Sequence, residues 1–387
     1  MIKRKALLSE IRDKINRYKV TVLLGPRQCG KTTIAKEIAD ETEAEYFDLE
    51  DPDCPLQEER AKIVLERYNN LVIIDEIQLQ PSLFSLLRVL SDRLNHPSRF
   101  LILGSASPSI IKNVSESLAG RAAFIEMGGF TIDEIGEDSE RLWIRGGLPL
   151  SYLAESDSFS FEWRKYFIKT FLERDIPQLG IRVPAQRLRR FWTMLAHYHG
   201  NIWNAAEIAR SLGTKEDSAR HYLDILTGTY LIRQLQPWFV NTGKRLVKSP
   251  KIYFRDTGLL HFLLGADSFN SLLSNPKLGL SWEGWCMEQI IHILKAEDNS
   301  YFYAAHSGSE LDLLIRINGK NYGFEFKYID SPKVTKSMNI VINDLDLEMI
   351  FVVYPGKNRS FLKEKIRLIP ENDIKILPRI LTGPVYP

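Results

Sequence analysis

A glycine-rich turn follows the apolar run Val20–Leu24 and precedes Thr33–Ala39, which has the composition of a helix. The turn fits the pattern G-x-x-x-x-G-K-[ST]. Glycines let successive backbone N–H groups point inward, where they bind phosphate oxygens beside the positive end of a helix dipole. Lys31 is predicted to reach the β- and γ-phosphates, and Thr32 to ligate Mg²⁺. The predicted phosphate-binding loop consists of Gly25, Pro26, Arg27, Gln28, Cys29, Gly30, Lys31, Thr32 and Thr33.

Length and composition indicate an ordinary globular protein. The chain has 387 residues, of which 44% are hydrophobic and 26% charged, which suits two or three domains. No segment reaches the ~18 consecutive apolar residues of a membrane span, and the basic N-terminus lacks the apolar region of a secretory signal. The three cysteines are too scattered for a disulfide framework or a zinc site built on paired cysteines. We therefore expect a cytoplasmic protein with no membrane partner.

Residues 1–150 alternate strand-like and helix-like segments, which predicts a parallel α/β sheet and a first domain. The expected strands are nearly continuous apolar runs, as in sheets buried on both faces. They are Glu45–Leu49, Leu71–Glu76, Phe100–Ser105 and Ala122–Met127, in addition to Val20–Leu24.

Two carboxylates, Asp75 and Glu76, end the predicted strand Leu71–Glu76. Open α/β sheets bind ligands beyond the carboxyl ends of their strands, so this pair is expected beside the phosphate loop. Asp75 is predicted to hold Mg²⁺ through water and Glu76 to orient and polarise the attacking water. The alternative is a solvated acidic pair at a strand end.

These motifs resemble the AAA+-type P-loop ATPases, with Gly25–Thr32 as Walker A and Leu71–Glu76 as Walker B. The resemblance implies ATP as the nucleotide and a homo-oligomer, with a hexameric ring among the candidates. It also implies that Ser105 is the polar sensor of the γ-phosphate, although Ser107 could serve instead. Arg121 resembles the arginine finger of the class, acting in cis or in trans. Its alternative is a surface arginine paired with an acidic neighbour.

A basic segment follows the helical connector predicted over residues 151–183. Residues 180–256 contain thirteen Lys or Arg against five Asp or Glu, in a chain whose net charge is only +2. Three predicted helices with a glycine turn, followed by two strand-like runs, indicate a winged helix-turn-helix over 184–265. Its predicted DNA contacts are Lys215, Ser218, Arg220 and His221 on the third helix, and Lys244, Arg245 and Lys248 in the wing. The alternative is a protein-packing module with a basic face.

Residues 279–387 change to a second α/β pattern. Glu325 and Lys327 are two apart on a predicted strand and therefore share a face, where Asp312 of the preceding strand is expected to join them. Two carboxylates suit Mg²⁺, and a lysine beside them can position water. The segment resembles the PD-(D/E)xK nucleases, whose helix acid, metal aspartate and E-x-K match Glu283, Asp312 and Glu325-Phe326-Lys327. Glu310 leaves the exact metal ligand open, and an ordinary strand with a wet face is the alternative.

The whole chain therefore resembles a prokaryotic family of AAA+-like ATPases with a C-terminal nuclease-like domain. The resemblance implies an ATP-hydrolysing oligomer that acts on DNA, with branched or junction DNA as the candidate substrate. One alternative is a nucleotide-controlled switch in which the nuclease-like domain is a binding scaffold. Another is a protein-remodelling ATPase without a nucleic acid partner.

Overall fold

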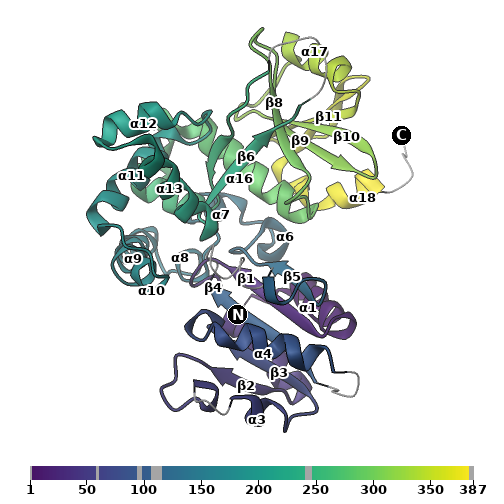
Figure 1. The fold of residues 1–387 in the computed structure, drawn as a ribbon. Helices are drawn as coiled ribbons and strands as arrows, with labels where there is room; N and C mark the ends of the chain where they lie inside the picture. Colours follow the sequence, from purple (N-terminus) through teal and green to yellow (C-terminus); the bar gives the residue numbers. More distant parts are fainter. Residues whose placement is uncertain (1, 58–60, 94–97, 106–115, 240–245, 383–387) are drawn as a thin grey trace. The chain divides into compact units, whose positions relative to one another are not determined.

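The computed structural model describes residues 2–57, 61–93, 98–105, 116–239 and 246–382, and the chain forms two compact units (Figure 1). The first unit comprises Met1–Gly129, Arg174–Arg182 and Asp224–Leu231. The second comprises Phe130–Glu173, Val183–Leu223 and Ile232–Pro387. The first continuous part of this unit ends at Gly129, whereas the sequence predicted a boundary at residue 150. Two short segments from later in the chain also belong to the unit.

The sheet of the first unit is parallel throughout, with the strand order β2-β3-β4-β1-β5. This confirms the predicted α/β core. Every residue of β1 is buried, because β4 and β5 pair with its two edges. The strands are β1 (Val20–Gly25), β2 (Glu45–Asp48), β3 (Leu71–Asp75), β4 (Arg99–Ser105) and β5 (Ala122–Glu126).

Alternation along β1 divides its side chains between the two faces of this sheet. Val20, Val22 and Leu24 lie in one core cluster, which also contains Phe84 and Leu87 of α4. Amphipathic helices therefore cover a sheet whose strands are apolar on both faces. The helices and turns of this unit are α1 (Lys5–Arg17), α2 (Lys31–Thr42), η1 (Pro55–Gln57), α3 (Ala61–Leu65), η2 (Ile77–Leu79), α4 (Ser82–Ser91) and α10 (Ile176–Gln178).

The second unit contains a mixed sheet with the strand order β12-β13-β11-β10-β9-β8-β6-β7. Its β9–β10 hairpin turns at Asn318 and Gly319, which both have positive φ, as the predicted Asn-Gly turn requires. The strands are β6 (Ile232–Pro237), β7 (Lys251–Phe254), β8 (Ser300–Ala304), β9 (Glu310–Ile317), β10 (Lys320–Phe326), β11 (Leu347–Tyr354), β12 (Ser360–Lys363) and β13 (Ile366–Pro370).

The hairpin expected to form a wing is part of this sheet. β6 pairs antiparallel with β7 on one side and parallel with β8 on the other, through Gln236 opposite Tyr301 and Pro237 opposite Phe302. Apart from Asp224–Leu231, which belongs to the first unit, the segments predicted as separate domains over 184–265 and 279–387 lie in one compact unit, and their strands share one sheet.

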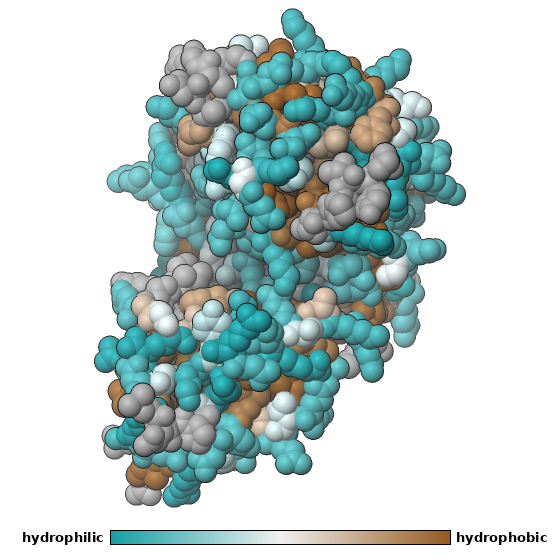
Figure 2. Space-filling model, turned by 90° about the vertical axis from the view of Figure 1, so that its right-hand side faces the viewer, coloured by the Kyte–Doolittle hydropathy of each residue, from teal (hydrophilic) through white to brown (hydrophobic). Residues whose placement is uncertain are grey.

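The predicted helix–glycine–helix arrangement lies before this hairpin. α12 ends at Gly213, which takes the left-handed conformation, and α13 begins at Glu216. None of the helices in the described ranges is both long and apolar enough to cross a membrane. Hydrophilic side chains dominate the face shown in Figure 2, with small hydrophobic areas between them. The helices and turns of the second unit and its connections are α6 (Ile132–Ile135), α7 (Ser139–Arg145), α8 (Pro149–Tyr152), α9 (Asp157–Thr170), a π-helical turn (Phe171–Asp175), α11 (Ala185–Tyr198), α12 (Ala205–Leu212), α13 (Glu216–Gly228), α14 (Thr257–Leu263), α15 (Phe269–Leu273), α16 (Leu278–Ile293), α17 (Lys336–Asp344), η4 (Glu371–Ile376) and α18 (Leu377–Thr382).

Candidate functional sites

The predicted phosphate loop connects β1 to α2, as its sequence requires. Gln28 and Gly30 have φ values of 60° and 99°, so the loop passes twice through the left-handed region. At Gly25 an added Cβ would lie 2.1 Å from the backbone oxygen of Met127, so only glycine fits where the strand enters the loop. Cys29 is fully buried beneath the loop. The loop is therefore a tight backbone turn at the start of a helix, which is the geometry of an anion site.

Lys31 lies across its own loop. Its Nζ donates to the backbone oxygens of Gly25 at 3.1 Å and Pro26 at 2.9 Å, and its side chain is buried. A third, longer contact from Nζ reaches Cys29 Sγ at 4.0 Å, so all three donors of the ammonium group face the loop. Thr32 and Thr33 follow in the first turn of α2, where Thr33 is exposed. The positive charge is thus aimed at the space enclosed by the loop.

Asp75 is the most strongly hydrogen-bonded carboxylate of this site. Its Oδ2 accepts from Thr32 Oγ1 at 2.7 Å and from the Tyr46 hydroxyl at 2.6 Å, and its Oδ1 accepts from the backbone N–H of Glu76 at 2.9 Å. The side chain is nearly inaccessible, at 2% exposure. Burial, together with the hydrogen bond to Asp75, raises the pKa of Tyr46, so this hydroxyl keeps its proton and donates.

A carboxylate beside a hydroxyl is a hard oxygen pair of the kind Mg²⁺ binds. In the described part of the chain, no cluster of three or more His, Cys, Asp or Glu could hold a metal by itself. Such a cluster is not needed for Mg²⁺ at a nucleotide, because this ion commonly takes one or two protein oxygens together with substrate phosphates. Thr32 and Asp75 therefore fit the predicted metal role.

Glu76 has the backbone strain and the environment of a functional carboxylate. Its φ is 54°, in the left-handed region that non-glycine residues seldom occupy. Burial raises the pKa of its carboxyl, an effect that the nearby Lys31 charge opposes. Gln78 donates a hydrogen bond to Glu76 Oε2 and so orients the group.

Ser105 ends β4, and the sheet order places this strand between β1 and β3. Gly25 pairs with Ser105 in register, so the serine lies directly beside the start of the phosphate loop. Its hydroxyl is buried and has no hydrogen-bond partner among the described residues. An unpartnered buried hydroxyl at this point is suited to a phosphate oxygen. The alternative, Ser107, lies outside the described residues.

Arg121 does not reach its own phosphate loop. It directly precedes β5, whose Ala122 pairs with Val20 at the start of β1, whereas the loop follows the end of that strand. The separation along the strand is roughly 16 Å. Arg121 instead binds Asp92 through both carboxylate oxygens, at 2.5 and 3.1 Å. Of the two roles left open by the sequence, the one in cis does not fit this geometry, because the arginine is paired with Asp92 near the amino ends of the strands.

Arg27 makes contacts that the sequence did not indicate. It forms ion pairs with Asp175, in the π-helical turn, and with Glu50, whose Oε1 lies 3.0 Å from Nη2. Arg27 therefore ties the phosphate loop to the segment Arg174–Arg182 within the first unit.

A second polar cluster lies in the second unit, where Glu283 of α16 meets residues of β9 and β10. Lys327 Nζ lies 2.8 Å from Glu325 Oε2 and 3.5 Å from Asp312 Oδ2, and Phe326 N–H donates to Asp312 Oδ2 at 3.1 Å. Glu283, Asp312 and Glu325 are all buried. The structure thus brings together the four residues that the sequence singled out.

Two residues of β7 complete this cluster, Lys251 and Tyr253. Lys251 Nζ lies 3.9 Å from Glu283 Oε1 and 2.5 Å from Glu310 Oε1, and the Tyr253 hydroxyl donates to Glu283 Oε1 at 2.5 Å. No sequence motif marks either residue, because β7 belongs to a hairpin that is distant in the chain from Glu283 and Asp312. Asp312 is buried among the acids whereas Glu310 is largely exposed, which favours Asp312 as the inward-facing carboxylate.

Burial governs the charge state of the acids in this cluster. Desolvation, followed by repulsion from Asp312, raises the pKa of Glu283 to about 7 and that of Glu325 to about 8. Burial lowers the pKa of Lys327, but Asp312 and Glu325 outweigh it, so the net pKa is raised and the lysine stays charged. Two lysines, Lys251 and Lys327, thus contact the carboxylates that a metal would use.

The predicted DNA-contacting residues lie on or near α13 and β7. Arg220 is exposed, and its guanidinium lies 3.8 Å from Glu216 of the same helix, while Ser218 is half-buried. Lys244 and Arg245 lie outside the described residues. The other predicted side chains, Lys215, His221 and Lys248, are exposed.

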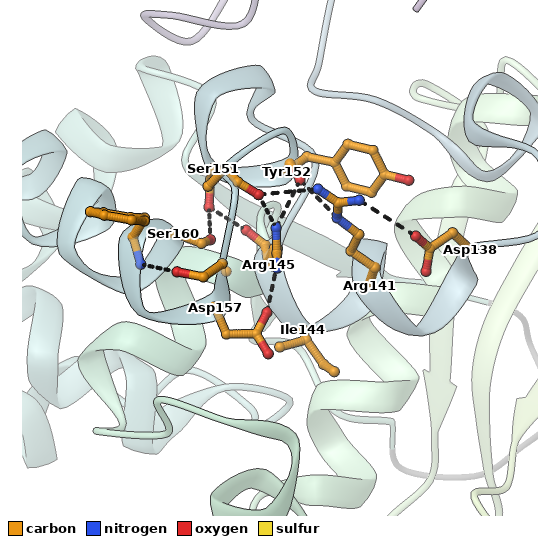
Figure 3. Close-up of polar contacts among 12 residues, drawn as sticks. Asp138, Arg141, Ile144, Arg145, Ser151, Tyr152, Asp157 and Ser160 are labelled. Atoms are coloured by element: carbon orange, nitrogen blue, oxygen red, sulfur yellow. Dashed lines mark hydrogen bonds and ion pairs between the residues drawn. The ribbon is translucent and has the colours of Figure 1, made fainter.

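The turn that follows α7 is a buried structural junction. Arg145 donates from Nε to Asp157 at 2.7 Å, and its other contacts are to backbone oxygens (Figure 3). An added Cβ would lie 2.3 Å from Asp256 Oδ1 at Gly146 and 2.1 Å from the backbone oxygen of Arg145 at Gly258. The two glycine-containing turns therefore interlock through close backbone approach. Close packing thus explains why glycine occupies positions 146 and 258.

Comparisons with known proteins agree with the nucleotide-site geometry. The AAA domain family matches residues 17–136, and the domains of unknown function DUF8612 and DUF4143 match residues 136–270 and 278–374. The Walker-type ATPase PABY2304 of Pyrococcus abyssi superposes with a TM-score of 0.50 at 16% identity, covering 68% of this chain and 96% of that chain. At this identity the similarity shows the fold. The first unit is thus a P-loop NTPase core of the AAA type.

Two full-length relatives place the chain more closely. The uncharacterized proteins Rv2008c of Mycobacterium tuberculosis and Mb2031c of Mycobacterium bovis are each 46% identical to it over 375 residues. These alignments cover 97% of this chain and 85% of each relative. The chain belongs to the same family as these two proteins.

Proposed function

We propose that the first unit binds ATP with Mg²⁺ and hydrolyses it. The observation that carries the proposal is the convergence of Lys31, Asp75, Glu76 and Ser105 at one edge of the sheet, around a loop that presents a helix N-terminus. Each group suits one part of phosphoryl transfer to water. AAA-type P-loop structure supports nucleotide binding, and the half-buried Glu76, with its positive φ, supports hydrolysis.

In this proposal Lys31 binds the β- and γ-phosphates, and Thr32 with Asp75 holds Mg²⁺, which neutralises the developing charge on the phosphates. Glu76 orients the attacking water and accepts its proton. The free hydroxyl of Ser105 donates to an oxygen of the γ-phosphate. Electrostatic stabilisation by the loop and its helix then favours the transition state over the bound substrate.

Glu76→Gln tests the proposal. The amide keeps the size of the side chain and an oxygen that can accept from Gln78, but it cannot take a proton. We expect kcat to fall by about 10²–10⁴-fold while the affinity for ATP is retained. Steady-state phosphate release and fluorescent-nucleotide binding measure the two quantities. Glu45→Gln, at an exposed carboxylate of β2, is the matched control, and an active Glu76→Gln enzyme would contradict the assignment.

We further propose that the protein acts on DNA, with branched or junction DNA as the candidate. Support comes from the excess of basic residues over 180–256 and from the exposed Lys215, Arg220, His221 and Lys248 after a helix–glycine–helix turn. Phosphate contacts make binding depend steeply on salt. ATP turnover should be measured with linear, flapped and junction DNA at low and moderate salt. No binding and no stimulation at low salt would reject the DNA partner and favour a protein-remodelling ATPase.

The cluster around Glu283 supports two roles, a Mg²⁺-dependent nuclease and an inactive binding scaffold. The order and meeting of Glu283, Asp312, Glu325 and Lys327 favour the nuclease. The scaffold, and with it a nucleotide-controlled switch, is supported by Lys251, which contacts Glu283 and Glu310 and is not part of the nuclease motif. Cleavage of DNA that is lost in Lys327→Met would support the nuclease, whereas unchanged DNA behaviour in that variant would support the scaffold.

A homo-oligomer, with a hexamer as one candidate, would give Arg121 a role in trans, because this residue cannot reach its own loop. Turnover per chain that rises with protein concentration in wild type, but not in Arg121→Ala, would support that arrangement.

The three cysteines are free and buried, which suits the reducing cytoplasm that we propose as the location.

A further inference from the structure

Tyr46 is a residue of the nucleotide site that no sequence motif marks. It lies on β2, where Tyr46 pairs with Ile73 and Asp48 pairs with Asp75. Residues two apart on a strand share a face, so Tyr46 is the diagonal neighbour of Asp75, a separation that an aromatic side chain can span. Its hydroxyl accordingly donates to Asp75 Oδ2 at 2.6 Å.

The tyrosine ring is held in place from a second side. Lys36 of α2 places its Nζ 5.8 Å from the centre of the ring. Lys36 lies four residues after Thr32, so the two share one face of α2. The ring therefore lies along the helix face that carries Thr32, and its hydroxyl points at the carboxylate that Thr32 also contacts.

Asp75 Oδ2 thus receives two hydroxyl donors, from Thr32 at 2.7 Å and from Tyr46. Thr32 has a second task in the proposed function, because its oxygen would ligate Mg²⁺. Without Tyr46, the backbone N–H of Glu76 would still hold Oδ1, but the hydroxyl that ligates the cation would also have to orient Oδ2. With Tyr46, the orientation of the carboxylate is secured independently of Thr32.

We propose that Tyr46 is a positioning residue that holds Asp75 in the orientation needed to bind Mg²⁺ at the nucleotide. This inference rests on the proposed ATP site. It assigns to β2 the task of ordering the metal-binding carboxylate, and it makes Mg²⁺ affinity, rather than nucleotide affinity, the quantity that Tyr46 controls.

Tyr46→Phe tests the proposal, since it removes one oxygen and keeps the ring. Binding of a fluorescent ATP analogue is measured by anisotropy, first in EDTA and then during a titration with MgCl₂. Hydrogen bonds to charged groups are strong enough that we expect the Mg²⁺ midpoint to rise about tenfold. Affinity in EDTA should be unchanged. Tyr68→Phe is the matched control, because Tyr68 packs its ring on Phe47, 5.7 Å away in the same unit, and is expected to titrate as wild type.

An unchanged Mg²⁺ midpoint in Tyr46→Phe would overturn the inference. So would an equal loss of affinity in EDTA and in Mg²⁺, because that result would indicate general damage to the loop. Failure of the wild-type protein to bind the analogue under any condition would instead reject the proposed ATP site.

Discussion

Replacing Lys251 by methionine tests whether the second polar cluster is an ion-pair network that the second unit needs for stability. Lys251 is 5% exposed, and its Nζ lies 3.9 Å from Glu283 Oε1 and 2.5 Å from Glu310 Oε1. Methionine keeps an unbranched stem against Phe302 but removes the charge. Glu283, at 9% exposure, then loses its nearest cation in a site that also contains Asp312.

The size of the effect follows from this burial. Removing one partner of a buried pair costs about 3–5 kcal/mol, and the lower value applies here because Glu310 is half-exposed and can turn to water. For a unit of this length, about 3 kcal/mol corresponds to a fall in Tm of about 6–12 °C. The pKa of Glu283, already about 7, rises further without Lys251. The carboxyl is therefore neutral at pH 6, and the loss of stability is larger at pH 8 than at pH 6.

Thermal unfolding at pH 6 and pH 8 measures this prediction, with Lys363→Met as a control at an exposed lysine of the same unit. The double variant Lys251→Met/Glu283→Gln should recover at least about 1 kcal/mol, because position 283 then carries no buried charge and the partner lost by Glu310 is replaced by water. A Lys251→Met protein that melts within about 1 °C of wild type at pH 8, or a double variant with purely additive losses, would refute the reasoning.

Two further predictions concern the packing and acid sensitivity of the second unit. Gly258→Ala should destabilise it by about 3 kcal/mol in denaturant unfolding, because the new Cβ would lie 2.1 Å from the backbone oxygen of Arg145. Gly279→Ala, with no atom within 4 Å of its added Cβ, should be neutral, and equal effects at the two glycines would contradict the steric argument. Burial lowers the pKa of both His199 and His261 to about 3, so between about pH 6.5 and 3 only the unfolded chain gains protons at these sites, and stability falls as the pH falls. Between pH 7 and pH 5 each histidine should lower the free energy of unfolding by about 2 kcal/mol. His261→Gln should remove about half of this combined loss. If the free energy of unfolding of the variant falls with pH as steeply as that of wild type, the prediction is wrong.

Sequence was sufficient for the parts of the nucleotide site that are local in the chain. The phosphate loop forms between a buried strand and a helix that are adjacent in sequence, so Gly25, Lys31 and Thr32 are placed by local backbone geometry. Asp75 and Glu76 were predicted because an apolar strand ends at them. The E-x-K spacing likewise put Glu325 and Lys327 on one side of a hairpin, where the structure has them.

Tertiary structure determined the relations between segments that are distant in the chain. The spacing of hydrophobic residues along the sequence predicts which residues are buried, but it does not predict which strands pair with one another. The order β2-β3-β4-β1-β5 places Ser105 beside the phosphate loop, and the parallel pairing of β5 with β1 places Arg121 at the opposite end of the strands from that loop. The same limit concealed Tyr46, which reaches Asp75 from the neighbouring strand β2.

The second unit shows the limit of sequence patterns most clearly. A helix–turn–helix followed by a hairpin indicated a separate winged domain, yet β6 hydrogen-bonds to β8 and the hairpin joins the C-terminal sheet. Lys251 and Tyr253 thereby enter a cluster of acids far along the chain. Backbone pairing between distant strands depends on which unpaired strand edges meet when the chain collapses, and local residue preferences do not specify that choice.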